Sequence, residues 1–286
     1  MTVGPAVSTP FAFQPGEEVE RGFFRALEEM AIEGRRIEQM SHGTAAESVH
    51  GTRVLIKRLR ALLWFASPAF SASALERPKT DLRKASHLLA AERELAVMRF
   101  QLEALARKTS KSADRNALLR LAHAQDSHSA TFARPERSLR HAAAIVLTTI
   151  RELKQKTNGG SHWPSVSKRL AKAFRALEKA GKKALRGADP VQFHDWRKRA
   201  KRLLYQLQLT QDDGDKRTVQ TIDRVDQLQQ KLGDYHDAVI VQDCLQKYPP
   251  DEISTRLVRH SVHLLEKRKH RLRKKVRKIA GHIKWK

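Results

Sequence analysis

Two short patterns each occur twice in this chain of 286 residues, and both pairs appear in the same order. The first pattern is HGTRVLIKR at residues 50–58 and HDWRKRAKR at residues 194–202, with a common His-x-x-Arg-x-x-x-Lys-Arg spacing. The second is LAAERE at residues 89–94 and LGDYHD at residues 232–237. Because both pairs are separated by nearly the same length of chain, the sequence predicts an internal duplication. The fold therefore has to accommodate a similar unit twice.

Apolar residues recur at helical spacing along most of the chain, and no segment shows the alternation or the Asn-Gly turn of a β-hairpin. Asp189 followed by Pro190 marks one helix start, because Asp caps helices and Pro suits their first turn. We expect eight helices, at about residues 17–41, 45–66, 78–107, 112–156 (with a break near Pro135), 164–187, 190–211, 215–247 and 251–284.

A glycine pair in residues 157–163 marks the best hinge in the chain. The expected organisation is a mobile leader at residues 1–16, a first four-helix half at residues 17–157 and a second four-helix half at residues 164–286. The predicted fold class is all-α. Two pseudo-symmetric four-helix bundles, produced by the duplication, would form one compact helical domain.

The formal net charge is +25, and Lys and Arg are spread along the whole chain. Such a charge favours a polyanionic partner, because self-repulsion destabilises a compact chain unless an anion offsets it. Cys244 is the only cysteine, which excludes an intrachain disulfide and fits a reducing compartment. The longest apolar stretch, residues 142–150, is too short to span a bilayer, and the leader has no secretion signal. We expect a cytoplasmic protein without membrane insertion.

The two helices that carry the first pattern are predicted to be two-sided. At about 100° per residue, one face of each carries the polar residues: His50, Arg53, Lys57 and Arg60 in the first, and His194, Arg197, Lys201 and Tyr205, flanked by Lys198, in the second. The opposite faces carry the apolar stripes Leu55, Leu59, Leu62, Ala66 and Trp196, Ala200, Leu203, Leu207. A solvated face more often alternates charges in i,i+4 pairs, and few such pairs occur here. Anion binding is therefore favoured over a neutral solvated face.

The doubled His-x-x-Arg-x-x-x-(Lys/Arg)-Arg pattern, followed by the second pattern, resembles the signature helices of the CHAD (conserved histidine α-helical domain) family. The chain departs from that family at three positions: Ala90 stands where glycine is usual, Glu94 where aspartate is usual and His236 where arginine is usual. The resemblance covers the chain from about Glu17 onward. It implies that the basic faces of the two bundles meet in a central groove that holds inorganic polyphosphate. It implies no catalytic activity, and we expect no cofactor or metal.

Polyphosphate also suits these residues on chemical grounds, because Lys offers a point charge and the Arg fork can engage two phosphate oxygens at once. Two interpretations of the pattern histidines remain open, namely contact with phosphate and bracing of a helix. Lys172 and the basic stretch at residues 267–278 could extend the cationic row. The residues expected to bind polyphosphate are His50, Arg53, Lys57, Arg58, Arg60, Arg83, Lys84, Arg93, Arg169, Arg175, His194, Arg197, Lys198, Lys201, Arg202, Tyr205 and Lys231.

Two other functions compete with this prediction. The HD dipeptides at residues 194–195 and 236–237 occur in helical metal phosphohydrolases, but the first copy has HG at residues 50–51, so only the cationic part is duplicated. The charge also permits non-specific nucleic-acid binding. Against that, aromatic residues make up only 6% of the chain, and neither a stacking platform nor a helix-turn-helix unit is evident. An association with polyphosphate or storage-polymer granules is compatible with the main prediction, and the oligomeric state stays open.

Overall fold

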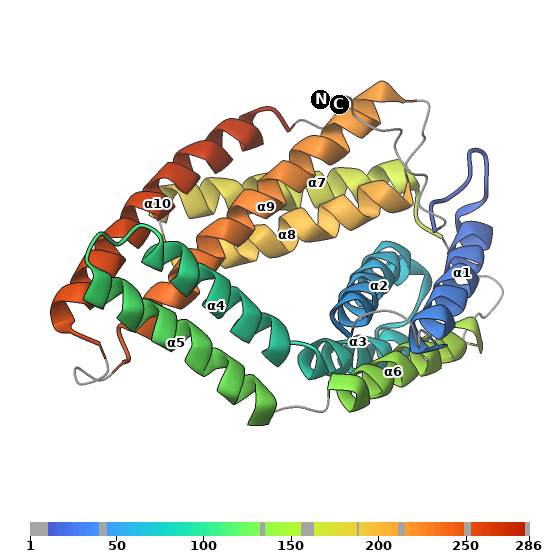
Figure 1. The fold of residues 1–286 in the computed structure, drawn as a ribbon. Coiled ribbons are helices and arrows are strands. Elements are labelled where there is room, and N and C mark those ends of the chain that lie inside the picture. The colour runs from blue at the N-terminus through green and yellow to red at the C-terminus, as the bar shows by residue number, and fades with distance from the viewer. Residues whose placement is uncertain are drawn as a thin grey trace.

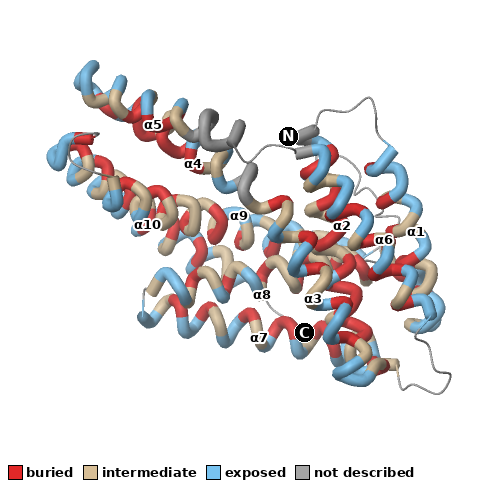
Figure 2. Tube along the Cα trace, turned by 90° about the horizontal axis from the view of Figure 1, so that it is seen from below, coloured by how far each residue is buried: buried red, intermediate tan, exposed pale blue. Residues whose placement is uncertain are grey.

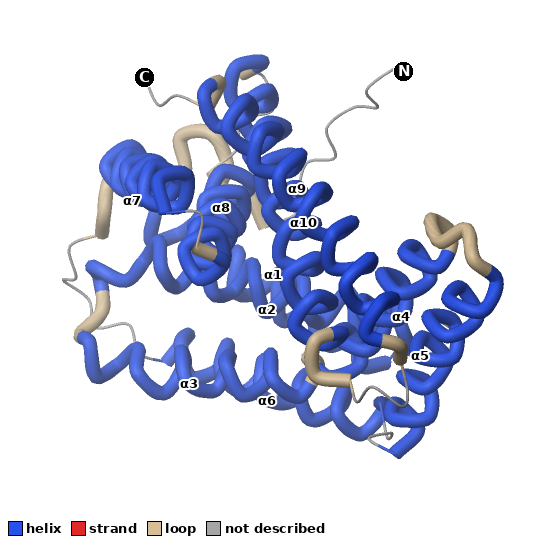
Figure 3. The backbone as a smooth tube through the Cα atoms, turned by 90° about the vertical axis from the view of Figure 1, so that its left-hand side faces the viewer, coloured by secondary structure: helices blue, strands red, loops and turns tan. Residues whose placement is uncertain are grey.

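The structure is a computed structural model, and it describes residues 11–39, 45–131, 135–155, 163–187, 189–210, 215–248 and 253–283. Within these ranges every regular element is a helix (Figure 3). The elements are α1 (Val19–Gln39), α2 (Ala45–Ala66), the 3-10 turn η1 (Ser67–Ala69), α3 (Ala72–Leu88), α4 (Ala91–Ala106), α5 (Ser112–Thr131), α6 (Pro135–Gln155), α7 (Val166–Gly187), α8 (Pro190–Leu209), α9 (Lys216–Leu245) and α10 (Thr255–Gly281). The all-α prediction is confirmed. No helix in the described ranges combines the length and apolar character needed to cross a bilayer.

The helix expected at residues 78–107 is two helices, α3 and α4, and it begins earlier than predicted. Ser71 caps α3, because its side-chain oxygen accepts a hydrogen bond from the Ala74 amide at 3.2 Å. Pro78 therefore lies inside α3 rather than in the first turn of a helix. The placement of that helix start from Pro78 was wrong, because the capping serine lies further upstream.

Other predicted boundaries agree with the structure. The segment expected at residues 112–156 is divided into α5 and α6, and α6 begins at Pro135, where the break was expected. The predicted start at Asp189 is confirmed, since its carboxylate accepts a hydrogen bond from the Val191 amide at 2.9 Å and Pro190 is the first residue of α8.

The helices enclose three cores, with buried residues on one side of each helix and exposed residues on the other (Figure 2). The first core, among α1, α2, α3 and α6, includes Phe23, Leu59, Leu82 and Val146. The second, among α7, α8, the first part of α9 and the end of α10, includes Trp196, Leu203, Leu228 and Val276. The third, among α4, α5, the rest of α9 and the start of α10, includes Leu102, Leu118, Val241 and Leu257.

The third core joins the two halves of the sequence. The helices α4 and α5 belong to the first half, yet they pack against α9 and α10 of the second, as Figure 1 shows. In the first half, the second pattern lies at the junction of α3 and α4. In the second half, the same pattern lies inside the continuous helix α9. The two halves thus share a core in addition to having one each.

The two helices that carry the first pattern, α2 and α8, contact each other directly. Each also reaches the core of the other half. Trp64 of α2 packs against the second core, while Leu209 and Tyr205 of α8 join or contact the first core. This reciprocal packing fixes the two pattern helices side by side.

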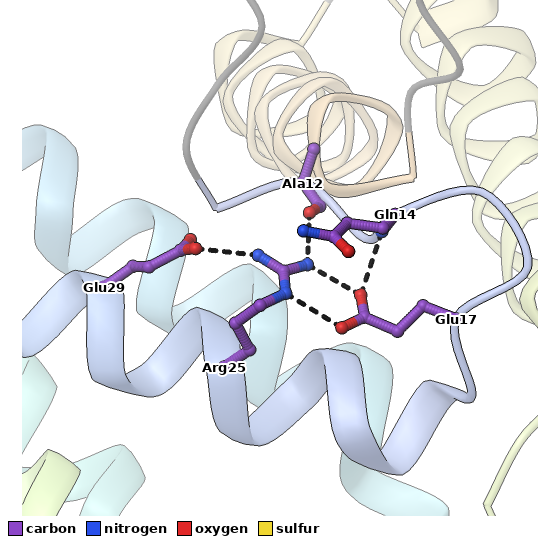
Figure 4. A network of polar contacts seen from close by, with 5 residues as sticks. All are labelled: Ala12, Gln14, Glu17, Arg25 and Glu29. Atoms are coloured by element: carbon purple, nitrogen blue, oxygen red, sulfur yellow. Dashed lines mark hydrogen bonds and ion pairs between the residues drawn. The ribbon is translucent and has the colours of Figure 1, made fainter.

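Residues 11–16 fall within the expected leader, and two of them pack in the first core. Phe11 and Phe13 are buried, and the Phe13 amide donates a hydrogen bond to the carbonyl oxygen of Leu209 at 2.7 Å. Arg25 on α1 holds this segment by donating to three acceptors (Figure 4), which are the carboxylates of Glu17 and Glu29, at 2.7 and 2.8 Å, and the carbonyl oxygen of Ala12, at 2.6 Å. Residues 1–10 lie outside the described ranges.

Candidate anion-binding site

The pattern helices bury the faces that the sequence assigned to the core. Both apolar stripes are buried, namely Leu55, Leu59, Leu62 and Ala66 on α2 and Trp196, Ala200, Leu203 and Leu207 on α8. The polar faces keep access to solvent: His50, Arg60 and Lys198 are exposed, and Arg53, Lys57, Arg58, His194, Arg197, Lys201, Arg202 and Tyr205 are half-buried. The prediction that both helices are two-sided is confirmed.

The pattern arginine of α2 contacts the backbone of the second pattern. Arg53 donates a hydrogen bond from Nη1 to the carbonyl oxygen of Leu89, the C-cap residue of α3. A charged donor to a carbonyl at a helix end satisfies one of the acceptors that the helix leaves without an internal partner. Arg53 therefore connects α2 to the junction of α3 and α4.

Arg197 has a comparable position on α8. A Cβ atom placed on Gly233 of α9 would lie 3.5 Å from Arg197 Nε and 3.7 Å from its Nη2. These are ordinary contact distances, so alanine would fit there. Ala90, which takes the place of Gly233 in the first copy, is therefore compatible with the same arrangement, and both pattern arginines lie against the second pattern of their own half.

Arginines from α2, α7 and α8 lie near one another where these helices meet. Burial lowers the pKa of Arg202, and the charges of Arg199 and Arg60 add to the effect. Burial also lowers the pKa of Arg169, and the charge of Arg202 adds to this effect. The pKa of Arg60 is lowered in the same way, by burial and by the charge of Arg83 on α3. The side chain of Arg60 reaches solvent, but protein atoms surround its guanidinium closely enough to desolvate it. We call Arg60, Arg169, Arg199 and Arg202 the arginine cluster.

Aromatic rings contact the cluster and its neighbour Arg58. The Trp64 ring lies 3.9 Å from Cζ of Arg169 and 5.4 Å from Cζ of Arg202. Arg58 lies 5.0 Å above the Phe11 ring, and burial lowers its pKa despite the opposing influence of Tyr205. The sequence prediction missed Trp64 and Arg199. Their positions on the pattern helices were the available signal, since Trp64 lies one turn beyond Arg60 and Arg199 lies inside the second pattern.

The two pattern histidines have different environments. His50 is exposed on α2, whereas His194 packs against His236 of α9 with ring centroids 4.6 Å apart. Burial lowers the pKa of His194, and the nearby cations Lys198, Arg197 and Lys201 add to this effect, while Asp195 opposes it. The Nδ1 atom of His194 is buried and has no hydrogen-bond partner within the described residues. His194 thus contacts a neighbouring helix, which is one of the two roles left open by the sequence.

Several secondary candidates have local partners. Lys84 pairs with Asp81 at 3.3 Å, and Lys231 pairs with Asp234 at 3.2 Å. Arg83 donates weakly within its own helix, to the Lys79 carbonyl oxygen and the Thr80 hydroxyl, both at 3.5 Å. Arg175 lines a surface pocket of about 620 Å³ on α7 together with Lys179, Lys182, Lys183 and Arg186. The side chain of Arg93 lies outside the described residues.

In the part of the chain that the structure describes, no three His, Cys, Asp or Glu side chains are grouped so that they could hold a metal ion. The HD dipeptide at residues 194–195 directs Asp195 toward Arg199, with the carboxylate 3.7 Å from Arg199 Nε. Its histidine contacts the ring of His236. The chemistry that these side chains offer at the meeting point of α2 and α8 is therefore dominated by hydrogen-bond donors with positive charge.

Comparison with known proteins agrees with the sequence pattern. A family model described as the CHAD domain matches residues 31–246. The crystal structure of the CHAD domain from the plant Ricinus communis is similar in fold, with a TM-score of 0.61, 18% sequence identity and 98% coverage of both chains. No curated protein matches the chain. Since the family match extends over most of the sequence, the chain belongs to the CHAD domain family.

Proposed function

We propose that this protein binds inorganic polyphosphate without catalysing a reaction, and that the arginine cluster is the centre of the binding site. The observation that carries this proposal is the grouping of Arg60, Arg199 and Arg202 on the contacting helices α2 and α8, where the charges of Arg199 and Arg60 add to burial in lowering the pKa of the partly desolvated Arg202. Like charges in such an environment destabilise the free protein, and a bound polyanion would relieve the repulsion. Polyphosphate binding is a general property of the CHAD family, which supports the same ligand.

The chemistry of the cluster suits a phosphate chain. Each phosphate carries about one negative charge, and a guanidinium can donate two parallel hydrogen bonds to its oxygens. The polar faces of α2 and α8 extend from the cluster through Lys57 and Lys201. We infer that these faces form one continuous basic groove, in which a thin flexible chain is accommodated more easily than a rigid duplex.

The test is a competition at physiological salt between long polyphosphate and a DNA duplex of equal total charge. Polyphosphate should displace DNA far more effectively than the reverse. Equal competition would indicate a surface that attracts any polyanion, and stronger binding of DNA would overturn the proposal in favour of a nucleic-acid partner.

A matched pair of double variants locates the site. Arg60→Gln with Arg202→Gln removes two charges from the cluster, while Arg107→Gln with Lys108→Gln removes two exposed charges at the end of α4. Only the first double variant should weaken polyphosphate binding strongly, because only it removes charges from the proposed site. If binding depended on the net charge alone, both double variants would weaken it to a similar extent. Incubation of polyphosphate with the protein should release no phosphate. Release of phosphate would contradict the proposal that the protein catalyses no reaction. Fluorescent labelling in cells would test whether the protein associates with polyphosphate or storage-polymer granules.

A further inference from the structure

Trp64 lies between two arginines that belong to different helices. Its ring faces the guanidinium of Arg169 from α7, at 3.9 Å, and that of Arg202 from α8, at 5.4 Å. Nη2 of Arg169 also donates hydrogen bonds to the carbonyl oxygen of Trp64 and, at 3.1 Å, to the hydroxyl of Ser67. A single residue of α2 is thus in contact with one cation from each of two neighbouring helices.

The two arginines are held without a direct ion pair, although the carboxylate of Asp195 favours the charged form of Arg202 from a greater distance. Arg169 is only 8% exposed, and in the described part of the chain neither Arg169 nor Arg202 forms an ion pair. Burial lowers the pKa of both, and each is close enough to a second arginine to be repelled by it. Contacts other than ion pairs therefore keep these side chains in place, namely the hydrogen bonds of Arg169 to Trp64 and Ser67 and the contacts of both arginines with the Trp64 ring.

We infer that Trp64 is a positioning residue of the polyanion site, an inference that rests on the proposed function. The negative face of an aromatic ring attracts a guanidinium without adding a negative charge of its own. A glutamate at this place would hold the arginines as firmly, but it would compete with the incoming anion. The indole instead leaves the full charge of Arg169 and Arg202 available to phosphate. The Phe11 ring makes a similar contact with one arginine of α2, Arg58, at 5.0 Å.

This role is distinct from a contribution to the core. Trp64 is half-buried and packs against the second core, so its loss would also affect stability. Trp163 provides a matched control, because it is also half-buried and packs among the rings of Phe23, Phe24 and Phe70. Replacement of either tryptophan removes a similar apolar area, but only Trp64 contacts the arginine cluster.

The experiment compares Trp64→Leu, Trp64→Phe and Trp163→Leu in polyphosphate titrations, together with their melting temperatures. Loss of two cation–π contacts should weaken binding by about three- to thirtyfold in Trp64→Leu. Trp64→Phe should recover much of this loss, because phenylalanine also presents an aromatic face. Trp163→Leu should melt at a lower temperature and bind as the unaltered protein does. The slope of log affinity against log salt should become shallower in Trp64→Leu by about one to two units.

Three results would overturn the inference: wild-type affinity in Trp64→Leu, an equal loss in Trp163→Leu, or no recovery in Trp64→Phe. If Trp64→Leu does not fold, the same comparison is made between Trp64→Phe and Trp163→Phe. Polyphosphate affinity should then decrease about two- to fivefold in Trp64→Phe and remain unchanged in Trp163→Phe. Each titration is repeated with a DNA duplex. Preference of the unaltered protein for DNA would refute the polyphosphate proposal, whereas the ranking of the variants with the preferred polyanion still decides the role of Trp64.

Discussion

The guanidinium of Arg53 donates a hydrogen bond to the backbone carbonyl oxygen of Leu89, which links α2 to the end of α3. In the other half, Arg197 of α8 lies against Gly233 of α9. The arginine that defines the first pattern thus lies against the second pattern in both halves, and in the first half it bonds to the backbone there. The repeated pairing of the two patterns in the sequence therefore corresponds to a contact between them in the fold.

Arg53 is therefore expected to contribute to stability as well as to charge. Replacement by glutamine should lower the free energy of unfolding by about 1–3 kcal/mol, because the Leu89 carbonyl oxygen loses a charged donor. Arg60→Gln should leave stability unchanged or raise it, because burial and the charge of Arg83 disfavour the cation at that place. Urea unfolding of the two variants measures the difference, and equal stability would contradict the structural role of Arg53.

Polyphosphate should stabilise the protein through the arginine cluster. A ligand at one hundred times its dissociation constant adds about 2.7 kcal/mol to the free energy of unfolding. Thermal melting with increasing polyphosphate should show this rise in the unaltered protein and a much smaller rise in the double variant of Arg60 and Arg202. The double variant of Arg107 and Lys108 serves as the control. Equal stabilisation of both double variants would place the binding site elsewhere.

The burial of His194 predicts a pH effect on stability. Its pKa in the folded protein lies below the ordinary value of 6.5. As the pH falls, the unfolded chain therefore takes up the proton first, and stability decreases as the pH drops below about 6.5 until the folded-state pKa is passed. The charged and titratable groups around it are Lys198, Arg197, Lys201, Asp195 and the neighbouring ring of His236.

In His194→Gln this part of the acid destabilisation should be absent. Urea unfolding at pH 7.5 and pH 5.5 measures it, with His141→Gln on the exposed surface of α6 as the control. A bound polyanion favours the protonated ring, so polyphosphate affinity should increase as the pH falls, and less so in His194→Gln. An identical pH response in His194→Gln and the unaltered protein would exclude His194 as the responsible group.

Two glycines on well-formed helices should respond in opposite ways to replacement by alanine. At Gly233 a Cβ atom meets Arg197 at contact distance, so Gly233→Ala should be tolerated and could gain about 0.5–1 kcal/mol from helix propensity. At Gly181 a Cβ atom would lie 2.8 Å from the ring of the buried Trp196. Gly181→Ala should therefore cost about 1–3 kcal/mol. Thermal melting of the two variants distinguishes these outcomes, and a large loss at Gly233 would contradict the proposed contact.

The sequence predicted the fold class and the buried faces well, because helical periodicity reflects which side of a helix is removed from water. It misplaced the start of α3, where Ser71 provides a cap upstream of the more conspicuous Pro78. It also assigned Phe11 and Phe13 to a leader, although both are buried. Isolated aromatic residues in a Pro-containing segment show no periodicity, so their burial depends on the shape of a distant surface.

The candidate site was predicted in part. The pattern residues on α2 and α8 do lie on adjacent helices, as expected for a shared site. The sequence could not show that Arg53 serves a backbone carbonyl, or that Trp64 contacts arginines from two other helices. Both relationships connect residues far apart in the chain, and helical spacing describes only neighbours on one helix. The internal duplication remains a prediction that the reciprocal packing of α2 and α8 supports.

The third core has a consequence for how the molecule unfolds. The helices α9 and α10 each pass from the second core into the third, where they cover α4 and α5 from the other half of the chain. Loss of either core would expose long apolar sides of the same two helices to water. The second and third cores should therefore melt together. The protein should therefore unfold in a single cooperative step. A fragment that ends after α6 would expose the buried side of the α4–α5 pair and would be prone to aggregation.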